Sequence, residues 1–173
     1  MQAFDSARYG PEVAALLEGP APDGLCHGAP VAALEAALAA LQLPPLCQAA
    51  LWLRFDFGER GHGIVQGLAG ADASYWHAIH HRREPDADNA KYWFRRVGAH
   101  PIHDDLLHSA AALRGDGPAV RRVAAWTVWD ASGFVDLCAA YAGKGSADEA
   151  CCKAMQQREW SLLFDRCFHA PPG

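Results

Sequence analysis

Apolar residues recur along most of this chain at the spacing of one face of an α-helix. In the segment 31–41 one face carries Val31, Leu34, Leu38 and Leu41, and alanines fill the other faces. The segment 160–168 has the same pattern, at i, i+3, i+4, i+7 and i+8, with Trp160, Leu163, Phe164, Cys167 and Phe168. Such spacing predicts amphipathic helices that each bury one side.

Proline, glycine and capping side chains mark the ends of these helices. Pro11 opens a helix that Gly19 follows, and Gly98 ends the helix expected over 88–97. Capping side chains are expected at three further helix starts, namely Asp72 or Ser74, then Asp130, then Ser146 with Glu149 in a capping box.

The expected helices cover 11–17, 31–41, 46–57, 74–84, 88–97, 102–114, 130–141 and 146–168. The segment 58–70 is either a glycine-weakened helix or a loop. Its glycines loosely match a dinucleotide-binding pattern, which needs a preceding strand that this chain does not offer. The segment 120–129 is interpreted as helix, although its β-branched residues also suit a strand.

Because no segment has a convincing partner strand, the sequence predicts an all-α fold. We expect one helical domain over residues 1–173, a bundle of about seven helices with a central helical hairpin at 74–98. The Pro/Gly-rich segment 1–30 is expected to pack on this domain.

Composition narrows the class of protein. The 173 residues are 51% hydrophobic and 20% charged, and the net charge of -5 argues against nonspecific binding to nucleic acid or to an anionic membrane. The longest apolar run, 31–43, is too short and too polar to span a bilayer, and the N-terminus lacks signal-peptide features. The six cysteines form no CxxC pair. We therefore expect a cytoplasmic protein with reduced, buried thiols and no membrane association.

The stretch 74–101 has the highest density of histidines, arginines, acidic residues and aromatic residues in the chain. On a helix over 74–84, Tyr75, Trp76 and Ile79 share one face, and the opposite face carries His77, His80, His81 and Glu84. His77 and His81 have the i, i+4 spacing that lets two imidazoles bind one metal ion.

Further ligands would have to come from other elements of the fold. A divalent metal such as zinc is predicted at His77, His81 and Glu84, with His62 or a histidine from 100–108. Alternatively, the stripe is solvated or hydrogen-bonded to neighbouring arginines and acids. Ala78 stands where the zinc-protease motif has its glutamate, so no protease is predicted.

Two resemblances overlap this stretch. EPDADNAKYWFRRV resembles the middle of one tetratricopeptide-type hairpin, with Ala90, Phe94 and Val97 at the matching positions, but only one such unit occurs. The strings YWH, HRREPD, NAKYWFRRVG and HP, together with WDASGFVDL and QQREWSLLFDRC, resemble an uncharacterised family of small bacterial proteins. That resemblance singles out Asp56, His62, Trp76, His77, His81, Arg82, Glu84, Asn89, Tyr92, Trp93, Asp136 and Glu159.

Three functional hypotheses follow. The first is a helical binding or interaction module for a small ligand or protein partner, with a polar cleft lined by His62, Trp76, His77, His81, Arg82, Glu84, Asn89 and Tyr92. The second is a metal-dependent, hydrolytic enzyme that uses the histidine and glutamate cluster. The third is a single-stranded nucleic-acid binder, because aromatic and basic residues interleave in 91–96. The acidic net charge disfavours the third. We also expect a polar network formed by Arg82, Arg83, Glu84 and Asp86.

Overall fold

A computed structural model describes residues 5–170, and these residues form helices joined by loops, with no β-strand among them. The α-helices are α1 (Pro11–Glu18), α2 (Glu35–Ala40), α3 (Pro45–Arg54), α4 (Gly58–Val65), α5 (Ala71–Arg83), α6 (Ala87–Val97), α7 (Ile102–Ala111), α8 (Pro118–Ala124), α9 (Ala131–Tyr141) and α10 (Ala147–His169). Two short 3₁₀ helices, η1 (Ser6–Tyr9) and η2 (Ala32–Leu34), complete the described part. The prediction of an all-α fold is confirmed.

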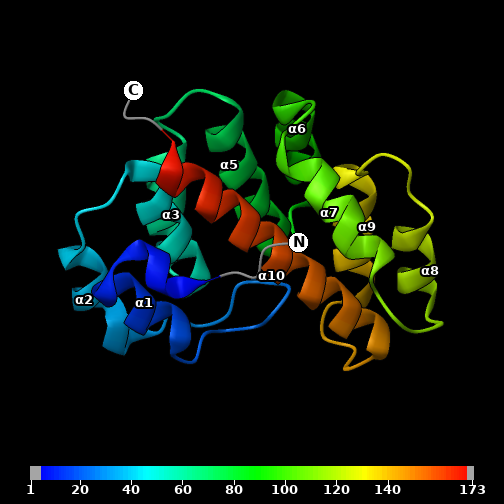
Figure 1. Cartoon of the computed structure of the whole chain (residues 1–173), viewed down its shortest axis with the longest axis horizontal. Coiled ribbons are helices and arrows are strands. Elements are labelled where there is room, and N and C mark those ends of the chain that lie inside the picture. Colours follow the sequence, from blue (N-terminus) through cyan, green and yellow to red (C-terminus); the bar gives the residue numbers. More distant parts are fainter. Residues whose placement is uncertain (1–4, 171–173) are drawn as a thin grey trace.

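Two helices organise the arrangement. The 23-residue α10 runs diagonally across the molecule, with α1, α2 and α3 on one side of Figure 1 and α7, α8 and α9 on the other. Helix α5 packs against α3, α4, α6 and α9, and 11 of its 13 residues are buried. The central hairpin of α5 and α6 therefore lies where the sequence predicted it. No helix in residues 5–170 has the length and apolar character needed to cross a bilayer.

The expected count of about seven helices and the bundle arrangement are wrong for this part of the chain. Ten α-helices form within residues 5–170, and they flank α10 as two groups in Figure 1. The segment 58–70, which the sequence left as either helix or loop, contains α4. Its glycines let this helix pack closely against a neighbour. A Cβ on Gly61 would lie 2.7 Å from Cγ of Leu53, so only glycine lets α4 approach α3 this closely. In 120–129, the helix α8 ends at Ala124.

Two of the expected caps are confirmed and one is wrong. Asp130 accepts a hydrogen bond from the backbone N–H of Gly133, and Ser146 accepts one from Glu149. Helix α5 begins at Ala71, so Asp72 lies inside its first turn. The Asp72 carboxylate instead accepts hydrogen bonds from other elements of the fold, because tertiary partners are within its reach.

A buried ion pair joins α5 to α10. Arg82 Nη2 donates to Glu159 Oε2 at 2.5 Å, and the Tyr75 hydroxyl donates to Glu159 Oε1 at 2.9 Å. Glu159 is 0% exposed and Arg82 is 4% exposed. Burial and the charge of Glu159 raise the pKa of Tyr75 well above its ordinary value, so its hydroxyl remains a donor. The Arg82 guanidinium also lies 4.8 Å from the Phe134 ring centroid, which places α9 against the same pair.

This pair predicts a large effect of a small substitution. Glu159→Gln keeps the side-chain size but leaves Arg82 buried without a counter-charge, so it should lower the free energy of unfolding by about 3–5 kcal/mol. Asp136→Asn is the matched control, because Asp136 pairs with Lys91 at the surface with 50% of its side chain exposed. That change should cost less than about 1 kcal/mol. Urea unfolding measures both, and equal effects would contradict the prediction.

Candidate metal centre

Three histidines from two helices converge beside the α5–α6 hairpin. His62 lies on α4, and His77 and His81 lie one turn apart on α5. One ring nitrogen of each lies within 4.8 Å of the others, and Nε2 of His62 is 2.8 Å from Nε2 of His77. His77 and His81 are 5% and 6% exposed. Three imidazole nitrogens around one small volume, largely shielded from water, are a donor set suited to a transition-metal ion.

The hydrogen bonds of His81 fix its tautomer. Nδ1 lies 2.9 Å from Glu84 Oε2, and a carboxylate can only accept, so Nδ1 carries the proton. Nε2 lies 3.1 Å from the Asn89 side-chain nitrogen, which donates to the remaining lone pair. Nε2 is the ring nitrogen of His81 without a proton, so a metal ion would bind there in place of the hydrogen bond from Asn89. A histidine whose other ring nitrogen donates to a carboxylate is the usual arrangement of a metal ligand.

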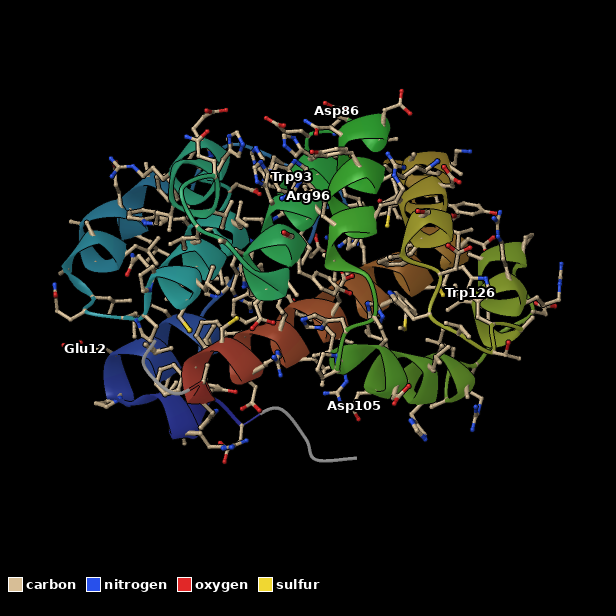
Figure 2. All side chains as sticks on the ribbon, turned by 90° about the horizontal axis from the view of Figure 1, so that it is seen from above. Glu12, Asp86, Trp93, Arg96, Asp105 and Trp126 are labelled. Carbon is tan, nitrogen blue, oxygen red and sulfur yellow. The ribbon has the colours of Figure 1, made fainter. Side chains whose placement is uncertain are left out.

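The ring of His77 is held by aromatic contacts. Trp93 of α6 stacks on it with ring centroids 3.8 Å apart and an interplanar angle of 17°. The Arg96 guanidinium lies 5.2 Å from the Trp93 ring centroid, and Figure 2 shows the two labels side by side on α6. The helix α6 therefore orients a ligand candidate that belongs to α5. Trp93 is among the residues that the resemblance in sequence singled out, and the structure places it against His77.

His80 lies between the two stacked histidines in sequence. Its Nδ1 is buried without a hydrogen-bond partner in the described structure, and its Nε2 lies 3.3 Å from Glu84 Oε1. Its ring stacks on His62 with centroids 4.5 Å apart. Burial, followed by the nearby His62, lowers the pKa of His80 to about 3, and burial with the same neighbour lowers the pKa of His77 to about 4. Both rings are therefore neutral at pH 7, which is the form that binds metal ions.

A second polar group adjoins the cluster. His27, in the loop before η2, lies with Nδ1 3.3 Å from Asp56 Oδ1, and Arg83 Nη2 donates to the same oxygen at 2.7 Å. Burial raises the pKa of Asp56, but the hydrogen bond from His27 and the charge of Arg83 outweigh it, so this pKa lies below its ordinary value. Because Asp56 accepts from Nδ1, the Nε2 atom of His27 is the buried nitrogen left without a partner.

These side chains border a pocket of about 430 Å³, whose walls include His27, Asp56, Gly58, His80 and Glu84. A Cβ on Gly58 would lie 3.3 Å from two atoms of the His27 ring and 3.4 Å from His80. Glycine at the first residue of α4 therefore lets both rings approach the backbone. The pocket is large enough for a small substrate, and two of its lining residues contact the cluster: His80 stacks on His62, and Glu84 accepts from His81.

The structure brings together some of the residues that the sequence singled out and separates others. His62, His77, His81, Glu84 and Asn89 meet at the cluster. Trp76 is 0% exposed and lies in the core, where its indole donates to Cys167 Sγ, so it lines no cleft. Arg82 pairs with Glu159, and Tyr92 is exposed on α6.

Other residues that the sequence linked to this region lie away from the three histidines. His100 donates from Nε2 to Asp72 Oδ1 of α5 at 2.7 Å and does not join the cluster. The expected network of polar residues at the end of α5 is split, because Arg83 pairs with Asp56 and Asp86 caps α6. His27 carried no signal in the sequence, since an isolated histidine in a loop has no periodicity.

Comparison of the chain with family models, with curated proteins and with solved structures finds no match.

Proposed function

We propose that this protein binds one divalent transition-metal ion through His62, His77 and His81 and is a metal-dependent hydrolytic enzyme. The observation that carries the proposal is the convergence of one nitrogen from each ring to within 4.8 Å. An interaction module would disperse these histidines along an open groove, so their convergence favours the metal-dependent hypothesis. Nucleic-acid stacking is disfavoured, because Trp93 already stacks on His77.

The spacing of the rings fits a metal ion after a small adjustment. Two nitrogens bound to one zinc ion at about 2.0–2.1 Å lie roughly 3.4 Å apart in a tetrahedral site. The Nε2 atoms of His62 and His77 are 2.8 Å apart, which is shorter than this spacing, and the ligand nitrogens of all three rings lie within 4.8 Å of one another. Metal binding would replace the contact between His62 and His77 and require side-chain rotations that bring the three nitrogens to equal spacing. Structural zinc sites use four protein ligands, whereas three with an open position are typical of catalytic sites. Three imidazoles also suit nickel, copper and iron.

The remaining residues of the site have separate tasks. A metal ion at such a position supplies Lewis acidity and lowers the pKa of bound water to about 7. Glu84 fixes the His81 tautomer through Nδ1, so it supports a ligand and is not itself assigned as one. His27 and His80 have unpartnered ring nitrogens in the walls of the pocket, where they can exchange protons with a bound molecule. We infer the same centre for proteins that share the YWH…HRREPD…NAKYWFRRVG signature.

Metal content tests the proposal directly. Protein purified without chelator should contain close to one zinc, nickel, iron or copper ion per chain by elemental analysis, because three preformed imidazoles favour such ions. The double variant His77→Ala, His81→Ala should contain none. His108→Ala is the matched control, since His108 is exposed on α7 and bonds only to the backbone of its own helix. Absence of metal from the parent, with no change in melting temperature on adding these ions, would sink the proposal.

Glu84→Gln separates the supporting role from direct coordination. Glutamine can still contact His81 but accepts its N–H bond less strongly, so zinc affinity should fall by about 10–100-fold while one ion still binds. Isothermal titration of the metal-free protein measures the change. Hydrolysis of model esters and phosphoesters should be lost with chelator and restored by the metal. Activity that persists in the double histidine variant would contradict a metal-dependent reaction.

The buried histidines also make stability depend on pH. In the unfolded metal-free chain these rings take up protons near pH 6.5, whereas the folded rings stay neutral down to about pH 4 for His77 and about pH 3 for His80. The unfolded state therefore binds more protons, and the free energy of unfolding should fall as pH falls from 6.5 towards 4, by up to about 1.4 kcal/mol per pH unit for each ring. Urea unfolding between pH 7.5 and 4.5 measures this slope.

His80→Asn should flatten that slope, because one of the two depressed groups is removed. His108→Asn should leave it unchanged, since its side chain is exposed. A slope that is the same in all three proteins would show that the histidines of α5 are not buried in neutral form.

A further inference from the structure

A second, more enclosed pocket is lined in part by Arg83 of α5. Its volume is about 140 Å³, and its walls come from α3, α5, α10 and the loop before them: Pro22, Asp23, Leu53, Arg54, Ile79, Arg83, Lys153, Gln156, Gln157 and Trp160. Three of these side chains are cationic and one, Asp23, is anionic. None of the three histidines proposed to bind metal lines this pocket. A positively charged recess is unusual in a chain with a net charge of -5.

Arg54 carries a charge that no acid compensates. Among the described residues its guanidinium donates to the Gln157 side-chain oxygen at 3.0 Å and lies 4.9 Å from the Trp160 ring centroid, and it forms no ion pair. Its Nε atom is buried without a hydrogen-bond partner. Burial and the neighbouring Arg83 charge lower the pKa of Arg54 from its ordinary value. A half-buried guanidinium near a like charge is costly unless an anion accompanies it.

Arg83 also has one guanidinium N–H group without a hydrogen-bond partner. It is 5% exposed, its Nη2 donates to Asp56, and its Nη1 donates to the backbone oxygen of Leu53. Its Nε is buried and has no partner. Arg54 and Arg83 both line the pocket, and each has a buried Nε without a hydrogen-bond partner. Guanidinium donors are the preferred partners of planar and tetrahedral oxyanions.

The rest of the wall limits what can enter. Lys153 lies 3.7 Å from Asp23 and 3.5 Å from Glu149, so its ammonium adds a third cation that already has two carboxylates beside it. Leu53, Ile79 and Trp160 form an apolar side. A cavity of about 150 Å³ is large enough for a benzene-sized molecule, so this pocket has room for an oxyanion with at most a few carbon atoms.

We propose that this pocket is a binding site for a small oxyanion, either inorganic phosphate or a short carboxylate, held by Arg54 and Arg83 with Lys153 at its edge. The bound anion supplies the negative charge that Arg54 lacks. The proposal does not depend on the metal centre, because none of the proposed metal ligands lines the pocket.

Isothermal titration with sodium phosphate and with sodium acetate, at constant ionic strength set by sodium chloride, tests the site and distinguishes the two anions. The full-length protein should bind one of them at one site per chain. Arg54→Gln should weaken that binding at least tenfold, because it removes a charged donor while preserving most of the side-chain volume. Arg96→Gln is the matched control, since Arg96 also stacks on an aromatic ring and lies exposed on α6. It should leave the affinity unchanged.

Two further variants keep the result interpretable. Lys153→Gln should weaken anion binding, but less than Arg54→Gln does. It provides the test if circular dichroism shows that Arg54→Gln folds poorly. The double variant His77→Ala, His81→Ala should bind the anion as the parent does. Binding lost in that double variant but kept in Arg54→Gln would place the anion at the histidines and overturn the proposal. Absence of binding to either anion at millimolar concentration would overturn it as well.

Discussion

The burial of the polar helix α5 is the constraint on which the rest of this structure depends. Its last turns carry three histidines and two arginines, and all five are buried. A buried charge must find a counter-charge or the fold loses several kcal/mol. Glu159 of α10 provides one for Arg82, and Asp56, just after α3, provides one for Arg83. These two pairs fix where α3 and α10 can lie relative to α5, and apolar packing fills the space between them.

The histidines of α5 have different kinds of partner from the arginines. Each arginine has a carboxylate within hydrogen-bonding distance, whereas the histidines are placed mainly against one another, with ring centroids about 4.5–5 Å apart. Such contacts do not satisfy ring nitrogens, and Nδ1 of His80 and Nε2 of His27 are buried without a hydrogen-bond partner. A fold optimised only for stability would replace such rings with apolar side chains. The unsatisfied nitrogens are therefore the strongest sign that this part of the molecule serves a ligand.

Arg83 joins the two regions for which ligands are proposed. One edge of its guanidinium holds Asp56, which in turn accepts from His27 in the wall of the larger pocket. Its free Nε belongs to a residue that lines the smaller pocket. Asp56 itself has a backbone φ of 64°, a conformation that non-glycine residues adopt rarely and at a cost of about 1–3 kcal/mol. Strain at this residue is consistent with a position fixed by its side-chain contacts to both regions.

The sequence by itself determined the helical fold and much of the local geometry. Apolar spacing, prolines and capping residues act within one or two turns, so they predicted the α5–α6 hairpin and the caps at Asp130 and Ser146. The i, i+4 spacing of His77 and His81 follows from the helix alone. Only the tertiary structure decided that α4 would be a helix, because the close approach of Gly61 to Leu53 is a contact between helices.

Only the tertiary structure, likewise, brought His62 and His27 to these rings and placed Trp76 in the core. It also decided that the polar face of α5 is buried. A stripe of histidines and arginines has the same pattern whether it faces water or a set of partners, and those partners are distant in sequence.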